Sequence, residues 1–166
     1  MSEENSPEQQ QIAPDVPINI LTQYVRDLSF ENPNAPQSII GGGGQPDMDL
    51  NIGMDARKIP DEDSDSLYEV VVNLKATAKR GDEVVFMVEL QYGATCEISK
   101  IPQENHHPVL LIEIPRLIFP FVRQIVSDTT VRGGFPPLLL NPVDFQALYM
   151  ERFKDEIEAA QKTAVN

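Results

Sequence analysis

Apolar and polar residues alternate along four stretches of the chain, and a period of two residues predicts β-strands. The predicted strands cover residues 23–31, 47–55, 67–78 and 83–92. In the first strand, strict alternation puts Tyr24, Leu28 and Phe30 on one face and Asp27 and Glu31 on the other. No helical pattern separates the strands, so we expect an antiparallel sheet with one apolar and one acidic face.

A helical pattern replaces the alternation after residue 114. Pro115 can open a helix, because the N–H groups of the first turn have no intrahelical partner. This helix has a broad apolar face formed by Leu117, Ile118, Phe121, Val122, Ile125 and Val126. Pro120 removes one backbone hydrogen bond and should kink the helix or mark its true start. Gly133 and Gly134 end it.

An apolar, proline-stiffened crossover leads to a second helix. Residues 135–137 (Phe-Pro-Pro) cannot continue the first helix, and residues 138–140 are three leucines. Asn141 followed by Pro142 is a capping residue before a proline, which predicts the start of the second helix. Residues 109–114 form a continuous apolar run, whose periodicity does not distinguish a buried strand from a helix start.

Together these patterns predict one α+β domain, with a four-stranded antiparallel sheet followed by two packed amphipathic helices. Residues 1–16 are polar and are predicted to be disordered. The folded domain is expected over residues 17–153. Residues 154–166 should form a C-terminal tail, in which the last helix ends before a flexible segment.

The chain carries 26 acidic and 13 basic residues, which gives a net charge of −13. Such a surface repels phosphates, so we expect no nucleic-acid partner. The single cysteine, Cys96, cannot form an internal disulfide, which suits a reducing cytosol. No stretch approaches the ~18 apolar residues that span a membrane, and the first residues lack the apolar core of a signal peptide. We therefore expect a cytoplasmic protein without direct membrane insertion.

The sequence offers little catalytic chemistry. Cys96 with His106 or His107 is the one thiol–imidazole combination, and no orienting group accompanies it. Two adjacent histidines without further Cys or His ligands make a poor metal site. The glycine run at residues 41–44 lacks the Lys-Ser/Thr of a phosphate loop and is predicted to be a flexible loop. We therefore predict no enzyme activity, no cofactor and no metal.

Three segments of the sequence resemble one known family. The segment TQYVRDLSFENPNAP is similar to the first strand of SecB, the bacterial protein-export chaperone family. Its central hairpin resembles LYEVVVNLKATAKRGDEVVFMVELQYG, and its main helix, crossover and final helix resemble PRLIFPFVRQIVSDTTVRGGFPPLLLNPVDFQALYMERF. The resemblance covers about residues 20–153. One departure is the region SIIGGGGQPD, where the family often has an aromatic-containing segment.

The resemblance implies a subunit that assembles as a homotetramer, a dimer of dimers. SecB-like proteins hold unfolded precursors in apolar grooves, keep them translocation-competent and deliver them to the motor ATPase SecA, without a cofactor or enzymatic activity. Two alternatives stay open. One is a SecB-like chaperone dedicated to a single client, such as a toxin–antitoxin pair, and the other is a small Cys/His-dependent enzyme.

Three sets of site residues are expected. The client groove should be lined by Leu50, Ile52, Phe135, Leu138, Leu140, Phe145 and Tyr149. The resemblance implies that the acidic sheet face receives the basic, zinc-binding tail of SecA, at Asp27, Glu31, Met87 and Glu89. The excess of apolar surface, together with the resemblance, indicates subunit contacts through the main helix and the fourth strand, whose apolar face carries Phe86, Val88, Leu90 and Tyr92.

Overall fold

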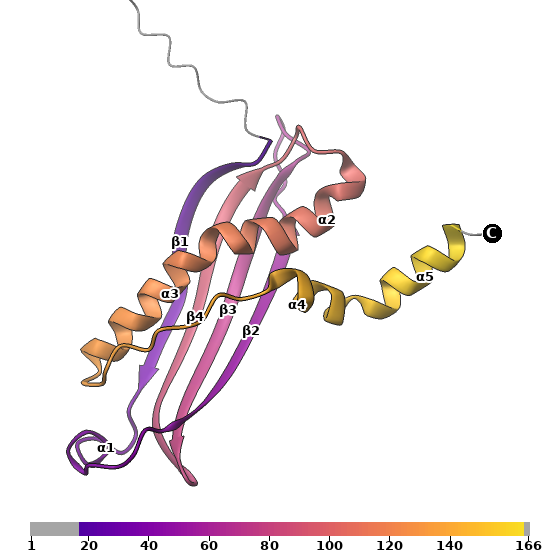
Figure 1. Ribbon diagram of the computed structural model, residues 1–166. Coiled ribbons are helices and arrows are strands. Elements are labelled where there is room, and N and C mark those ends of the chain that lie inside the picture. The colour runs from indigo at the N-terminus through magenta and orange to yellow at the C-terminus, as the bar shows by residue number, and fades with distance from the viewer. Residues whose placement is uncertain (1–16, 165–166) are drawn as a thin grey trace, which may run out of the picture.

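Four antiparallel strands form the sheet that organises the fold, as the alternation predicts (Figure 1). The computed structural model describes residues 17–164, so the disorder predicted for residues 1–16 falls outside the described residues. The strands are β1 (Asn19–Glu31), β2 (Asp47–Lys58), β3 (Leu67–Arg80) and β4 (Glu83–Glu97). Their order across the sheet is β1-β4-β3-β2, so β1 and β2 are the edge strands. A one-turn helix, α1 (Gln37–Ile40), lies between β1 and β2 in the chain.

The main helix, α3 (Ile114–Arg132), lies across one face of the sheet, and the hydrophobic core lies between them (Figure 1). Ile118, Val122 and Val126 recur at every fourth position of α3 and are fully buried. The neighbouring apolar positions Leu117 and Phe121 stay 49% and 45% exposed. The apolar face predicted for this helix is therefore wider than the stripe that the sheet covers.

An extra residue in β1 reverses the predicted alternation. The register of β1 against β4 shifts next to Arg26, and such a β-bulge moves the residues on its two sides to opposite faces. Tyr24 lies on the sheet face away from α3, where its hydroxyl donates a hydrogen bond to Glu69. Leu28 and Phe30 lie on the face that α3 covers. The prediction that Tyr24 shares a face with them is therefore wrong, because counting by twos cannot include a bulge.

The apolar run at residues 109–114 is helical. It belongs to a series of short helical segments that lead into α3: η1 (Gln103–Asn105), α2 (His106–Pro108) and η2 (Val109–Glu113). η2 is a π-helical turn. It ends two residues before Pro115, which has no N–H to donate to the preceding turn, so the wider π-turn lies where the ladder of helical hydrogen bonds is interrupted. The helical structure thus begins before Pro115, and Pro120 lies inside α3 rather than at its start.

Two further helices follow the crossover, α4 (Phe145–Arg152) and α5 (Lys154–Ala164). Asp144 caps α4, because its Oδ1 accepts a hydrogen bond from the Ala147 N–H at 3.0 Å. The predicted start at Asn141 is wrong, because residues 136–144 form an extended crossover that returns along the sheet (Figure 1). α5 has no buried residue and projects away from the sheet, so the predicted tail is helical throughout its described part.

Candidate functional site

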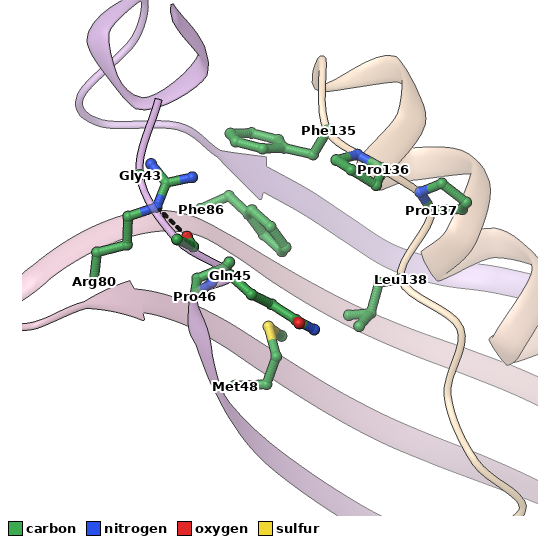
Figure 2. Close-up of a pocket in the computed structure, with 11 residues that line it drawn as sticks. Gly43, Gln45, Pro46, Met48, Arg80, Phe86, Phe135, Pro136, Pro137 and Leu138 are labelled. Carbon is green, nitrogen blue, oxygen red and sulfur yellow. Dashed lines mark hydrogen bonds between the residues drawn. The ribbon is translucent and has the colours of Figure 1, made fainter. Parts of the chain in front are cut away.

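An apolar hollow of about 420 Å³ lies between the crossover, the start of β2 and the glycine-rich segment that precedes β2 (Figure 2). We call it the crossover hollow. Its lining residues are Gly43, Gly44, Gln45, Pro46, Met48, Arg80, Phe86, Phe135, Pro136, Pro137 and Leu138. The volume falls in the range of ligand pockets, so a large apolar side chain can enter it.

Thr130 fixes the crossover wall of the hollow. This residue is fully buried near the end of α3, and its hydroxyl donates to the Ser127 carbonyl at 2.9 Å. The same oxygen accepts a hydrogen bond from the Leu138 N–H at 2.9 Å. A side chain on the helix therefore holds the backbone of the crossover, and Leu138 is placed on the hollow.

An aromatic cluster forms the adjoining wall. The ring centroids of Phe86 and Phe135 lie 4.8 Å apart, and Phe30 lies 6.0 Å from Phe86 and 6.3 Å from Phe135. A Cβ atom at Gly133 would overlap the ring of Phe30, so the glycine that ends α3 also lets the helix end approach β1. The hollow thus has a rigid aromatic side that the strands and the helix end position together.

Arg80 holds the opposite wall, the glycine-rich segment. Its Nε donates to the Gly44 carbonyl at 3.0 Å and its Nη1 donates to the Ser38 carbonyl at 3.1 Å. A Cβ atom at Gly43 would lie 2.7 Å from Cδ of Arg80, so a larger residue here would displace the arginine side chain from this position. The glycine run therefore packs closely against an arginine side chain and forms one rim of the hollow.

The structure brings together part of the predicted client groove. Phe135 and Leu138 line the crossover hollow. Leu50 and Ile52 lie outside it, on the helix-facing side of β2 that they share with Met48, and Leu50 is 43% exposed. Alternation could have found Met48, because it lies two residues before Leu50. Met48, Leu50 and Ile52 therefore form an apolar strip along β2 that extends away from the hollow.

Three predicted groove residues lie elsewhere. Leu140 and Phe145 are 4% and 1% exposed and belong to the core. The Tyr149 hydroxyl lies 2.8 Å from Nδ1 of His107, in an aromatic cluster with Phe153 that holds α4. The sequence pattern could not separate these residues from groove residues, because both kinds are apolar positions after the crossover.

The sheet face away from α3 carries the predicted docking residues, and we call it the acidic face. The strand register pairs Glu31 with Met87 and Asp27 with Gln91, and Glu89 lies between these two pairs on β4. The four predicted residues, Asp27, Glu31, Met87 and Glu89, therefore lie close together on one side of the sheet.

Lys75 on β3 lies among these carboxylates, which sequence reasoning did not foresee. Its Nζ lies 2.8 Å from Oε1 of Glu89. The hydrogen bond to Glu89 raises the pKa of Lys75, and the charges of Glu31 and Asp49 raise it further. Glu89 therefore already has a cationic partner within the chain, whereas no ion pair is found for Asp27 or Glu31 within residues 17–164.

Glu69 is the buried carboxylate of the acidic face, at 4% exposure. It accepts hydrogen bonds from Arg57 Nε on β2 and from the Tyr24 hydroxyl on β1, and Arg26 Nη1 lies 3.7 Å away. The hydrogen bonds from Arg57 and then Tyr24 lower the pKa of Glu69. The Tyr24 ring reaches Glu69 by crossing Gly93, where a Cβ would lie 2.7 Å from the ring.

The predicted subunit-contact residues lie inside the subunit. The exposed fractions are 5%, 0%, 1% and 7% for Phe86, Val88, Leu90 and Tyr92, respectively. All four point toward α3 and form part of the core. A direct contact with a second subunit therefore has to involve other residues.

Exposed apolar residues lie on β1 and on α3, the main helix, which is also predicted to contribute to the subunit contacts. Val25 and Leu28 on β1 are 46% and 42% exposed, and Leu117 and Phe121 on α3 are exposed to a similar degree. Val25 pairs with Tyr92 across the sheet, and the ring of Phe121 stacks on Tyr92 with centroids 6.3 Å apart. Tyr92 thus links Val25 on β1 to Phe121 on α3, and we call the four exposed residues Val25, Leu28, Leu117 and Phe121 the β1–α3 face.

The thiol–imidazole combination has no catalytic geometry. Cys96 is fully buried, and burial raises the pKa of its thiol to about 11, so the thiol is protonated at neutral pH. His106 lies 3.1 Å from the Tyr68 hydroxyl through Nδ1 and 2.8 Å from the Ile101 carbonyl through Nε2. Both ring nitrogens of His106 are therefore used in structural contacts.

Two further observations concern the described part of the chain, residues 17–164. No helix there is long and apolar enough to cross a membrane. No group of three or more His, Cys, Asp or Glu side chains in this part is arranged to hold a metal ion.

The sequence of this chain is similar to one family of known proteins. The family model of the preprotein translocase subunit SecB matches residues 9–156. The protein-export protein SecB of Bartonella bacilliformis is 48% identical over 82% of this chain and 84% of its own length. The same protein of Agrobacterium fabrum is 47% identical over 89% of this chain and 90% of its own length.

A solved structure has a similar fold. It is a SecB-like chaperone of Mycobacterium tuberculosis in complex with a peptide from an antitoxin, and the TM-score is 0.59. The two chains are 17% identical, and the match covers 76% of this chain and 87% of that one. This likeness concerns the fold, an antiparallel sheet covered by helices on one face.

Proposed function

The chain belongs to the SecB family of protein-export chaperones, and from this premise we propose that it holds unfolded precursor proteins in the crossover hollow. It keeps them competent for translocation and delivers them to the motor ATPase SecA in the cytoplasm. The observation that carries this proposal is the hollow itself, because it is apolar, preformed and continued by the exposed strip of β2.

The physical basis is burial of apolar surface. An unfolded precursor exposes apolar and aromatic side chains, and burying them contributes roughly 25 cal/mol per Å², offset by the cost of ordering the bound chain. Met48 and Leu50 stay 39% and 43% exposed beside the hollow, so the chaperone offers matching surface without unfolding. No particular sequence in the precursor is needed for such contacts, which suits a chaperone for many clients.

The export function fits the relatives better than a chaperone dedicated to one client. The solved SecB-like chaperone is in complex with an antitoxin peptide, and its sequence is only 17% identical to that of this chain. The SecB proteins of the relatives that are nearly half identical carry the name protein-export protein. An enzyme that uses Cys96 is disfavoured by the burial of its thiol.

The chaperone is proposed to work as a homotetramer, a dimer of dimers. The β1–α3 face supports this assembly, because its four large apolar side chains are about half exposed, and exposed apolar patches mark protein–protein interfaces. The acidic face is proposed to dock the basic tail of SecA through Asp27, Glu31, Met87 and Glu89. Client and motor would then occupy opposite faces of the same sheet.

Suppression of aggregation tests client holding. Leu138→Gln should weaken the ability of the chaperone to keep a denatured precursor soluble, because it puts an amide on the wall of the hollow. Leu139→Gln is the matched control, since Leu139 is the next residue, is 63% exposed and does not line the hollow. Equal protection by the Leu138→Gln variant and the wild type, with both folded, would contradict the proposed site.

A further inference from the structure

The β-bulge of β1 lies directly before Asp27, one of the residues proposed to dock the motor. Val25 pairs with Tyr92 on β4 and Asp27 pairs with Gln91, so Arg26 is the extra residue between two successive pairs. The bulge points Asp27 toward the acidic face. A regular strand with the same pairing at Val25 would point Asp27 toward α3 instead, because side chains alternate between the two faces.

Glu69 on β3 holds two residues of this bulge. Its carboxylate accepts a hydrogen bond from the Tyr24 hydroxyl, and its Oε2 lies 3.7 Å from Nη1 of Arg26. The Tyr24 ring crosses β4 at Gly93, where the missing Cβ leaves room for it. One carboxylate therefore contacts the residue before the bulge and the extra residue itself, although β3 does not pair with β1.

The same carboxylate determines which partner Arg26 has. Arg26 is next to Asp27 in the chain, yet its ion pair is with Glu69. Glu69 is buried, and a buried carboxylate costs free energy unless donors and cations satisfy it, so it competes strongly for the guanidinium. Asp27 is exposed and has no ion pair in the part of the chain that the structure describes, residues 17–164.

We propose that Glu69 is a positioning residue for motor docking, which fixes the bulge of β1 and keeps Asp27 free of Arg26. The inference rests on the proposed function, because it assumes that the acidic face receives the basic tail of SecA. Glu69 is only 4% exposed, so it offers the tail almost no surface of its own. Its effect on docking passes through Asp27.

The other docking residue of β1, Glu31, does not depend on Glu69. It follows Phe30, whose ring packs with Phe86 and Phe135 in the aromatic cluster. That end of β1 therefore has an anchor of its own on the opposite face of the sheet. The two carboxylates of β1 should thus respond differently when the contacts of Glu69 are removed.

Double-mutant cycles test this difference, with the isolated basic tail of SecA titrated by calorimetry at low salt. Asp27→Asn should weaken binding about twofold in the wild-type background, because one free carboxylate is lost. In the Glu69→Gln background it should change the affinity little, because the released Arg26 already neutralises Asp27. Glu31→Gln is the matched control, and it should cost about twofold in both backgrounds.

Two substitutions that keep the net charge separate positioning from the loss of a charge. Tyr24→Phe removes the hydroxyl that binds Glu69, and Gly93→Ala puts a Cβ 2.7 Å from the Tyr24 ring. In each of these backgrounds Asp27→Asn should cost less than in the wild type. Tyr68→Phe is the matched control, since its hydroxyl lies 3.1 Å from a ring nitrogen on α2 and does not contact Glu69.

The outcomes separate this inference from the proposed function. If Asp27→Asn costs the same twofold in the wild type and in the Tyr24→Phe and Glu69→Gln backgrounds, Glu69 does not position Asp27 and the inference is wrong, while docking stands. If Glu69→Gln does not fold, the Tyr24→Phe background alone decides. If the wild type does not bind the tail, the proposed docking is wrong and the inference with it.

Discussion

Glu69 binds side chains from both edge strands of the sheet. Tyr24 and Arg26 reach it from β1, and Arg57 reaches it from β2. A buried carboxylate is stable only when its oxygens are hydrogen-bonded, and here the donors come from strands that do not pair with each other. One residue on β3 thus ties the acidic face together across its full width.

Replacing Glu69 by Gln should destabilise the subunit by about 2 kcal/mol, because Arg57 and Tyr24 lose a charged acceptor. The pKa of Glu69 is lowered in the folded protein, so its contribution is present at neutral pH and is lost as pH falls below the ordinary value of about 4.3. Urea denaturation at pH 7 and pH 3 measures both effects.

The control for this prediction is Glu89→Gln, which removes a carboxylate that is 46% exposed from the same face. It should change the free energy of unfolding by less than about 1 kcal/mol. An equal loss of stability in the two variants would contradict a special role of Glu69.

Cys96 predicts a second pH dependence, at alkaline pH. Its pKa is raised to about 11, while an unfolded cysteine ionises near pH ~8.5. The contribution of the buried thiol to the free energy of unfolding is therefore full below pH ~8.5 and is lost as pH rises toward 11, by an amount on the order of 3 kcal/mol. Cys96→Ala should lose less stability than the wild type between pH 8 and pH 10.5, measured by chemical denaturation. Parallel loss in both proteins would contradict the prediction.

At the scale of elements, the alternation and the helical period were sufficient to predict the sheet and the main helix. The predictions were wrong where a β-bulge adds one residue to a strand and where a single capping side chain determines the first residue of a helix. The bulge at Arg26 reverses the faces of β1, and Asp144 caps α4 in place of Asn141. The apolar run before Pro115 is helical through a π-turn, which has no simple sequence period.

Thr130 gives a prediction about the crossover. Thr130→Val keeps the shape of the side chain but leaves the Leu138 N–H without its acceptor, so it should destabilise the protein by about 1–2 kcal/mol. Hydrogen exchange at the Leu138 amide should become faster, because that amide is no longer held. Client holding should weaken as the wall of the hollow loosens.

Thr129→Val is the matched control, since the Thr129 hydroxyl donates to the Ile125 carbonyl of its own helix and, among residues 17–164, to no group of the crossover. Its crossover amides should exchange as in the wild type. The same exchange rate at Leu138 in both variants would mean that Thr130 does not hold the crossover.

At the scale of the whole molecule, the sequence pattern could not tell which apolar residues line a surface hollow and which belong to the core. Phe135 and Leu138, which were predicted for the client groove, line the hollow together with Arg80 and Phe86, which were not predicted for it. Arg80 lies in a hairpin far along the chain from the crossover, and only the folded sheet brings them together. Leu90 was predicted at a subunit contact but is buried in the core, because a pattern of apolar positions cannot distinguish core residues from interface residues.

The assembly gives a prediction about the β1–α3 face. Phe121→Glu should reduce the tetramer to smaller species in light scattering, because a charge replaces an apolar side chain that is 45% exposed. The subunit itself should stay folded. Met150→Glu is the control, since Met150 is 49% exposed on α4, outside this face. A wild-type mass of one subunit at micromolar concentration would contradict the tetramer.

The acidic face gives the last prediction, on the docking of SecA. Asp27 and Glu31 lie on one face of β1 without an ion pair among residues 17–164, whereas Glu89 is paired with Lys75. The double variant Asp27→Asn/Glu31→Gln should therefore bind the basic tail of SecA about fivefold more weakly, because two free carboxylates are lost. Calorimetric titration at low and high salt measures this, and the wild-type affinity should fall as salt screens the charges.

The matched control removes the same two charges from the loop between β2 and β3, as Glu62→Gln/Asp63→Asn. This variant has the same net charge as the first, so it separates local pairing from the general attraction between an acidic protein and a basic tail. Docking on the acidic face requires that only the β1 variant loses affinity and that both keep the tetramer mass and precursor holding. Equal loss in both variants would mean that the net charge of the chain, and not this face, attracts the motor.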